Sequence, residues 1–583
     1  MTERPTIGTP TPPSDLPPPS PPAPTSTPAF TVAAGRRFLR DDEVTRGRAL
    51  LVVRLVIGVY LLELLLNLTR PHVLPDEPSL TIFWRFPGMP EEGALDSFGS
   101  LFAIPRTAFW GVLAGIVVGI ALQAVIVRMP SKDRRATVLT WAALAVLLGS
   151  FALFSLFVLA KSPLLVLACV PTSAFALWLI HRAQRFGWLP LPMLLTAFGW
   201  GALIQWGVGR AFTNLAYGTI NGYMYEGTDL TGSTTDGPGN QVDFTFTFDL
   251  GYRTIDVTLL HLSTVNQLAA AAGVVLLILM FRHRVTDVVT GLVLGAAAGL
   301  GYNFTESVIV IELWSILSSL NGATGGFEYW IRQSVSLFGS QVVFGALVGA
   351  GIGLAAQTRR RAQRVGLVTA GLVAAIGGAV ANEVLSAWLS GLVRDHVGIG
   401  GTLDTLVISP AIWLAPQVPF LTVCLLLLRS GSRARVAAAR VAATAEAAEA
   451  GVGGAITGRE VPFLMDPALR FWALVSTWRR HGPAAARALR RFQRAQLEVA
   501  GWRWQQERAA EAKALGAREQ PQAQEERETQ DAQETQETQE VQQAQEAPEA
   551  PEAPEAREAR EEGEALQARA MRLRTDVGRL VGS

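Results

Sequence analysis

Polar side chains recur within long apolar stretches in the second half of the chain. Residues 299–314, GLGYNFTESVIVIELW, place Asn303 and Glu306 in a stretch that is hydrophobic enough to cross a membrane. A carboxylate inside a bilayer is costly unless a partner compensates it, so an intramembrane acid is a candidate functional residue. Glu306 is therefore the first candidate for chemistry, as a catalytic acid or base or as a metal ligand.

Small residues accompany Glu306 at a regular spacing. Before Glu306, the same stretch has a glycine at every fourth position, and this row ends in an asparagine: Gly291, Gly295, Gly299 and Asn303. The next apolar stretch has a similar row that starts with an amide: Gln341, Gly345, Gly349 and Gly353. Residues four apart share a helix face, and small residues let helices approach closely in lipid. We therefore expect Glu306 to point into a tightly packed bundle and away from lipid.

Neighbouring apolar stretches carry amides at a similar depth. Asn266 and Gln267 lie about ten residues from one end of their stretch, or ~15 Å at a rise of 1.5 Å per residue. Asn382 comes late in another stretch, next to Glu383 and one turn before Ser386. Interhelical hydrogen bonds would explain each of these residues separately. Four helices that bring amides and a carboxylate to one level predict a site, or a former site.

The helices that position these residues belong to a predicted all-α, polytopic membrane bundle. Runs of about 20 apolar residues can cross a bilayer. About ten are found, at 49–68, 109–128, 137–160, 163–180, 188–208, 256–281, 286–317, 333–356, 365–389 and 405–428. Alternate connections, at 128–135, 181–185, 282–284 and 359–364, are basic. Because short cytoplasmic loops are enriched in Lys and Arg, we expect both termini to be cytoplasmic.

Five parts follow from this pattern. Residues 1–48 are Pro-rich and predicted to be disordered. Five transmembrane helices fill 49–208, an extracytoplasmic loop follows at 209–255, and five more helices fill 256–429. Alternation of apolar and polar residues at 242–248 predicts a strand within that loop. The tail, 430–583, is predicted to be helical, with coiled-coil character, and then Glu/Gln-rich and of low complexity.

The tail combines aromatic residues with many arginines between 467 and 515. Two structures fit this composition: a basic amphipathic helix on an anionic inner leaflet, or helices packed against one another or against the bundle. No nucleic-acid-binding motif is present, so the bilayer is the expected partner of the arginines. The Ala- and Arg-rich composition suggests a bacterial plasma membrane. The oligomeric state is not defined by the sequence.

Residues 281–311, FRHRVTDVVTGLVLGAAAGLGYNFTESVIVI, resemble the second signature of PrsW-type intramembrane metalloproteases. That signature joins a basic loop, an Asp, a Gly-rich span and an end similar to GxGFAxxEN, and Glu306 falls on its Glu. The resemblance extends over roughly 256–395. Asn266 and Gln267 stand where the family has a Glu pair, Gln341 where it has a His, and Asn382 and Ser386 where it has an HxxxN pattern.

The resemblance implies a zinc-dependent protease, but the expected ligand positions hold neutral amides. Zinc takes thiolate, imidazole or carboxylate donors, and amides cannot act as general bases near pH 7. We therefore expect no zinc and interpret the chain as a pseudoprotease that keeps the architecture and binds membrane-protein partners. Glu306 would then be protonated, or would accept hydrogen bonds from Asn266, Gln267 or Gln341.

Two other functions remain open. The chain could be an active intramembrane metalloprotease that binds zinc through a displaced set, His261, Glu306 and Glu383. It could also be a transporter or channel, which Gly-rich spans and a polar centre would suit, although neither an internal repeat nor paired broken helices are evident. Cys169 and Cys424 lie in separate apolar runs and favour packing over a disulfide or a metal site.

Overall fold

The computed structural model describes most of the 583-residue chain. The described residues are 43–72, 78–83, 106–129, 134–184, 189–223, 229–235, 241–247, 257–321, 325–358, 360–397, 401–450, 454–534 and 554–582. The disorder predicted for 1–48 therefore lies almost wholly outside the described residues. So does the Glu/Gln-rich stretch at 535–553.

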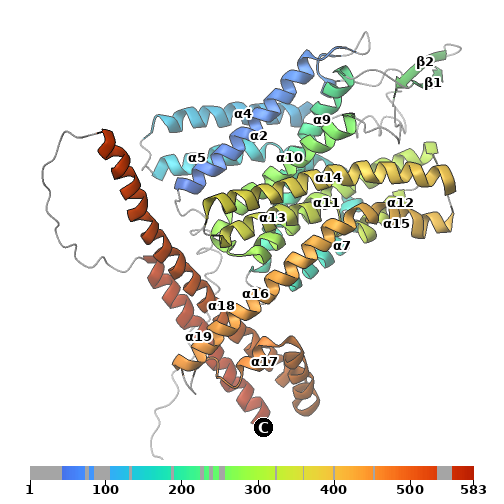
Figure 1. Cartoon of the computed structure of the whole chain (residues 1–583). Helices are drawn as coiled ribbons and strands as arrows, with labels where there is room; N and C mark the ends of the chain where they lie inside the picture. The colour runs from blue at the N-terminus through green and yellow to red at the C-terminus, as the bar shows by residue number, and fades with distance from the viewer. Residues whose placement is uncertain are drawn as a thin grey trace, which may run out of the picture.

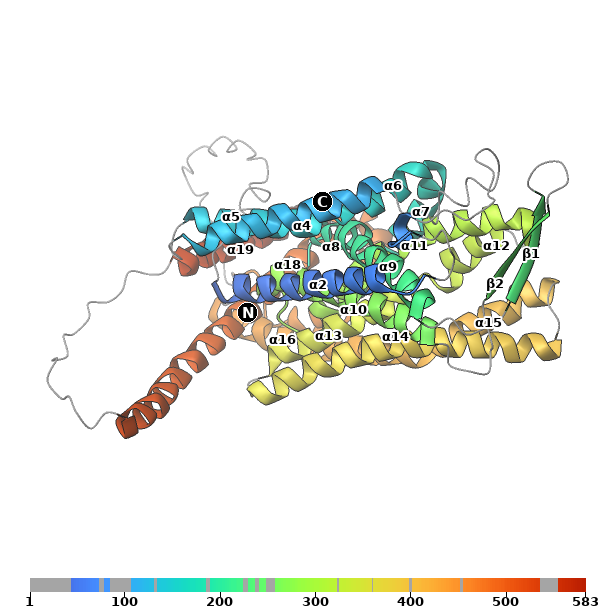
Figure 2. The same ribbon diagram turned by 90° about the horizontal axis from the view of Figure 1, so that it is seen from above.

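Long apolar helices form a bundle and confirm the all-α, polytopic membrane fold (Figures 1 and 2). Within the described residues, eight helices are long and apolar enough to cross a membrane, or nine if two helices bent by 46° form one span. A shorter apolar helix completes ten segments in the predicted order. The helices that make up these segments are α2 (Glu43–Thr69), α4 (Arg106–Val127), α5 (Arg134–Gly149), α6 (Ala152–Lys161), α7 (Pro163–Ala183), α8 (Leu191–Trp200), α9 (Trp206–Tyr223), α10 (Val257–Met280), α11 (Val288–Asn321), α12 (Gly325–Trp330), α13 (Gln341–Gln357), α14 (Arg361–Val397), α15 (Ser409–Leu414) and α16 (Val418–Ala450).

Helix α11 forms the centre of the bundle and packs antiparallel against α13. A Cβ atom added to Gly291 or Gly295 would overlap the carbonyl oxygen of Gly349 or Gly345, respectively. One turn later, a Cβ on Gly299 would overlap the carbonyl oxygen of Gln341. The two backbones are therefore in direct contact, which confirms the close approach predicted from the glycine spacing.

The first helices share a hydrophobic core with the second half of the bundle. Residues from α2, α4, α5 and α6 pack with residues of α9, α10 and α11. The buried amide of Asn67 in α2 donates to the carbonyl oxygen of Leu215 in α9 at 2.7 Å. The buried carboxylate of Glu63, also in α2, lies 3.5 Å from the imidazole of His261 in α10. The amino-terminal helices are thus an integral part of the bundle.

The fifth span extends beyond its predicted end at 208. Helix α8 continues through a π-helical turn, η2 (Gly201–Gln205), into α9, so the predicted loop at 209–255 begins inside a helix. The apolar span covers residues 191–216 and so includes Arg210, which lowers the local hydropathy without ending the helix. The predicted strand at 242–248 is confirmed: β2 (Gln241–Thr247) pairs antiparallel with β1 (Asp229–Thr235).

The eighth predicted span, 333–356, is broken rather than continuous. Helix α12 leads into a second π-helical turn, η4 (Ile331–Val335), and α13 starts only at Gln341. Between them, Ser340 has a φ of 48°, a left-handed conformation that non-glycine residues rarely adopt. The Ser340 backbone N–H donates to the side-chain oxygen of the buried Gln417 at 2.9 Å, which satisfies a donor at the start of α13.

The tail forms a separate small core at one end of the bundle, and the β1–β2 pair lies at the other (Figures 1 and 2). Helix α16 runs out of the membrane bundle into this core, where it meets α17 (Val461–Met465), α18 (Pro467–Glu534) and α19 (Pro554–Gly582). Gly482, with a φ of 79°, divides α18 into two helical segments.

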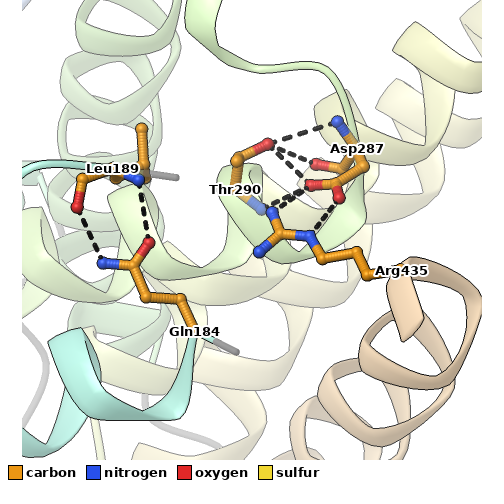
Figure 3. Close-up of polar contacts among 5 residues, drawn as sticks. All are labelled: Gln184, Leu189, Asp287, Thr290 and Arg435. Carbon is orange, nitrogen blue, oxygen red and sulfur yellow. Dashed lines mark hydrogen bonds and ion pairs between the residues drawn. The ribbon is translucent and has the colours of Figure 1, made fainter. Parts of the chain in front are cut away.

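A buried ion pair joins the start of α11 to α16 (Figure 3). Both N–H groups of one edge of the Arg435 guanidinium donate to the carboxylate of Asp287, and the Nη2–Oδ1 distance is 2.6 Å. Asp287 also caps α11 by accepting from the Thr290 backbone N–H at 2.8 Å. Burial acts to raise the pKa of Asp287, but the Arg435 and Thr290 contacts outweigh it, so the pKa lies below its ordinary value.

The candidate intramembrane site

Glu306 lies within a cluster of charged residues from four elements. Arg210 of α9 and Arg332 of η4 are close enough to interact with its carboxylate electrostatically. Glu383 of α14 is a second carboxylate within electrostatic range. Arg332 also forms an ion pair with Glu328, with 3.4 Å between Nε and Oε2. The two arginines offset part of the cost of burying these carboxylates inside the bundle.

Asn266 approaches this cluster through Tyr302, which lies one turn before Glu306 on α11. The Tyr302 hydroxyl donates to the Asn266 Oδ1 at 2.7 Å, and the tyrosine is buried. Gly209 of α9 packs against the pair, because a Cβ there would lie 2.6 Å from the Asn266 Oδ1. The amide oxygen is thus occupied by a hydroxyl donor and enclosed by backbone.

Asn303 and Gln341 lie at the break that precedes α13. The Asn303 amide donates to the carbonyl oxygen of Gly339 at 3.3 Å. Gln341 is buried as the first residue of α13, with its backbone against Gly299. Both residues therefore stabilise the irregular segment at 336–340. Among the described residues, no hydrogen bond joins Glu306 to Asn266, Gln267 or Gln341, although one was considered from the sequence.

Asn382 and Ser386 of α14 leave polar atoms unsatisfied. The buried Oδ1 of Asn382 and Oγ of Ser386 have no hydrogen-bond partner in the described part of the chain. The same holds for the Oγ of Ser263 on α10, a helix that packs against α14. Gln267, one turn after Ser263, is also buried. Buried polar groups are normally paired, so these three atoms lack a partner that the described residues do not supply.

Three members of the cluster were not predicted as site residues. Arg210 was assigned to an outer loop and Arg332 to a connection, because arginine lowers the local hydropathy that defines a span. Tyr302 lies four residues before Glu306, and this spacing places both on one face of α11. That spacing was the signal that could have identified Tyr302 from the sequence.

Residues 189–391, from α8 to α14, match the family model described as PrsW family intramembrane metalloprotease. This region is similar to the PrsW family. It contains Glu306, all of the amides named above and both arginines of the cluster. The match begins earlier than the resemblance at 256–395 and includes α8 and α9. No curated protein and no solved structure matches the chain.

A zinc ion is implied by the name of the PrsW family, but the residues of this PrsW region do not fit one. Within the described residues, no three His, Cys, Asp or Glu side chains are placed to hold a metal ion. The displaced set considered from the sequence fails because His261 pairs with Glu63 of α2 instead of joining Glu306 and Glu383. The Asn266 oxygen, at the position of the family's Glu pair, is bound to Tyr302. We therefore derive no step that requires zinc.

Proposed function

We propose that this protein is a non-catalytic member of the PrsW family that binds transmembrane segments of partner proteins. The Tyr302–Asn266 hydrogen bond of 2.7 Å carries the proposal. This hydrogen bond engages the side-chain oxygen of Asn266, whereas a metal ligand at this position would need to be a free anionic group. Arg210 and Arg332 place positive charge near Glu306, where a metal ion would otherwise lie, and offset part of the cost of its burial.

Partner binding is supported by exposed apolar side chains on α10 and α14, the helices that also hold the unsatisfied polar atoms. Asn382 Oδ1 needs a donor, and the hydroxyls of Ser263 and Ser386 can donate or accept. Large apolar side chains on the same two helices are exposed at the outside of the bundle: Leu268, Leu385, Trp388 and Leu392. A transmembrane helix of a partner would cover part of this apolar surface.

Purified protein is expected to contain well below one zinc per chain and to cleave no membrane substrate. Metal analysis by mass spectrometry and a cleavage assay would measure both. A chain with Asn266→Glu, Gln267→Glu, Gln341→His and Asn382→His restores the family's ligand types. It should gain zinc if it folds, and an active metalloprotease serves as the positive control for the assays. About one tightly held zinc per chain in the natural protein, lost in Glu306→Ala, would contradict the proposal.

A photo-crosslinking residue in place of Leu385 is expected to form adducts with a partner membrane protein in cells. The same residue at Val117, which is 67% exposed on α4, is the matched control and should form none. Trp388→Ser should decrease the Leu385 adducts several-fold, because it removes a large exposed side chain from the same surface. Equal adducts at Leu385 and Val117, or no effect of Trp388→Ser, would count against a partner at α10 and α14.

Transport is a second candidate because one observation favours it. The broken span, 331–340, lies beside the Glu306 cluster, and broken helices next to intramembrane charges form the substrate sites of many transporters. Solute or ion uptake by vesicles that contain the purified protein would support this candidate over partner binding.

A further inference from the structure

We propose that residues 467–481, the first segment of α18, form an interfacial helix that binds the anionic phospholipids of the inner leaflet. This segment is bounded by an N-terminal cap and by a backbone break. The Asp466 carboxylate accepts from the Ala468 backbone N–H at 2.8 Å, and Gly482 ends the segment with a φ of 79°. The segment is thus a short, separate helix.

The interfacial helix is not packed into the core of the tail. None of residues 467–481 is buried, whereas the later part of α18 contributes Ala495, Val499 and Ala500 to that core. Large aromatic side chains are exposed instead, with Phe471 at 58%, Trp472 at 61% and Trp478 at 58%. Phe471 and Trp478 are seven residues apart and therefore share one face of the helix.

The interfacial helix carries positive charge and no acidic residue. No Asp or Glu occurs from Pro467 to Leu497, whereas seven arginines do, three within the helix and four after Gly482: Arg470, Arg479, Arg480, Arg487, Arg490, Arg491 and Arg494. Arg479 and Arg480 directly follow Trp478 and are exposed. Tryptophan favours the membrane–water interface, and clustered arginines are attracted to anionic lipid headgroups. The combination favours a lipid surface over an apolar protein surface, which would leave the arginines unmatched.

The fold places the interfacial helix at the membrane boundary. Asp287 and Arg435 pair at the start of α11, where the apolar part of the bundle ends. The tail core begins on α16 at Ala439, four residues after Arg435, or ~6 Å along the helix. Val461, Leu464 and Met465 of α17 pack in this core, and the interfacial helix follows at once. Because the helix is tethered this close to the bilayer, its binding to the bilayer costs little additional entropy.

Hydrogen–deuterium exchange of the full chain in nanodiscs would test this proposal. With phosphatidylglycerol in phosphatidylcholine nanodiscs, amides of 467–481 are expected to exchange about tenfold more slowly than in phosphatidylcholine alone. The double variant Arg479→Gln, Arg480→Gln should remove this difference, and so should Phe471→Ser with Trp478→Ser. Arg572→Gln, an exposed arginine of α19, is the matched control and should retain it.

Equal exchange in the two lipid compositions would overturn the proposal. So would protection in phosphatidylcholine alone that persists in the double arginine variant, since that result would indicate that protein covers the aromatic face. The substituted side chains are exposed, and an unchanged melting temperature would verify that the variants are folded. The result does not depend on zinc or on a partner at α10 and α14, so it can fail independently of the proposed function.

Discussion

Arg435→Met is expected to lower the free energy of unfolding of the full chain by about 3–5 kcal/mol, because it leaves the Asp287 carboxylate buried without its cation. Both side chains of the pair are almost completely buried, with 2% and 3% exposed. The loss should be visible as a lower midpoint of thermal or denaturant-induced unfolding of the detergent-solubilised protein. It should also separate the tail from the bundle, since Arg435 lies between the two cores on α16.

Two further variants identify the cause of this loss. Arg433→Met, two residues away and exposed, is the matched control and should leave the midpoint unchanged. The double variant Asp287→Leu, Arg435→Met removes both charges and should recover most of the stability, because an apolar pair carries no desolvation cost. A double variant as unstable as Arg435→Met would show that the packing of Arg435 matters more than its charge.

The same ion pair gives the stability a defined dependence on pH. The pKa of Asp287 is lowered in the folded protein below its ordinary value of 3.8. Such a carboxylate binds protons more weakly in the folded protein than in the unfolded chain. Its contribution to the free energy of unfolding is therefore complete above about pH 4 and is lost as the pH falls through the folded pKa. The unfolding midpoint of Asp287→Asn should therefore vary less below pH 4 than that of the natural protein. An equal acid response in both would exclude Asp287 as its source.

Gly295→Val is expected to destabilise the chain by about 3 kcal/mol or more, because the new side chain would overlap the backbone of α13. The atom in its way is the carbonyl oxygen of Gly345, which cannot move without displacing the whole helix. Residues of α13 are almost all buried, so the displacement would spread to α14 and α16. Unfolding midpoints in detergent would measure the loss.

Gly377→Ala is the matched control for this substitution. Gly377 lies in the middle of α14, and a Cβ there would meet no atom within 4 Å. Alanine is about 1 kcal/mol better than glycine within a helix, so this variant should be as stable as the natural protein or slightly more stable. If Gly295→Val unfolded at the same midpoint as Gly377→Ala, α11 and α13 would not be in contact.

The order of the membrane segments and the α11–α13 contact were predictable because both depend on short-range patterns. Apolar runs of about 20 residues define spans, and glycines at every fourth residue define a close helix contact. The predicted end of the fifth span at 208 and the predicted continuity of the eighth span were wrong. Arg210 lowers hydropathy without ending its helix, and the bond from Ser340 to Gln417 joins residues that are far apart in the sequence.

The apolar spans, the family resemblance around Glu306 and the amides in neighbouring spans can be recognised from the sequence alone, because each depends on residue type and local spacing. The surroundings of Glu306 were decided only by the tertiary structure. Arg210 and Arg332 approach its carboxylate from α9 and η4. The Tyr302 hydroxyl donates to the Asn266 side chain, and His261 pairs with Glu63 instead of with Glu306. These contacts join helices from distant parts of the chain, and their geometry is set by how the helices pack rather than by any local pattern.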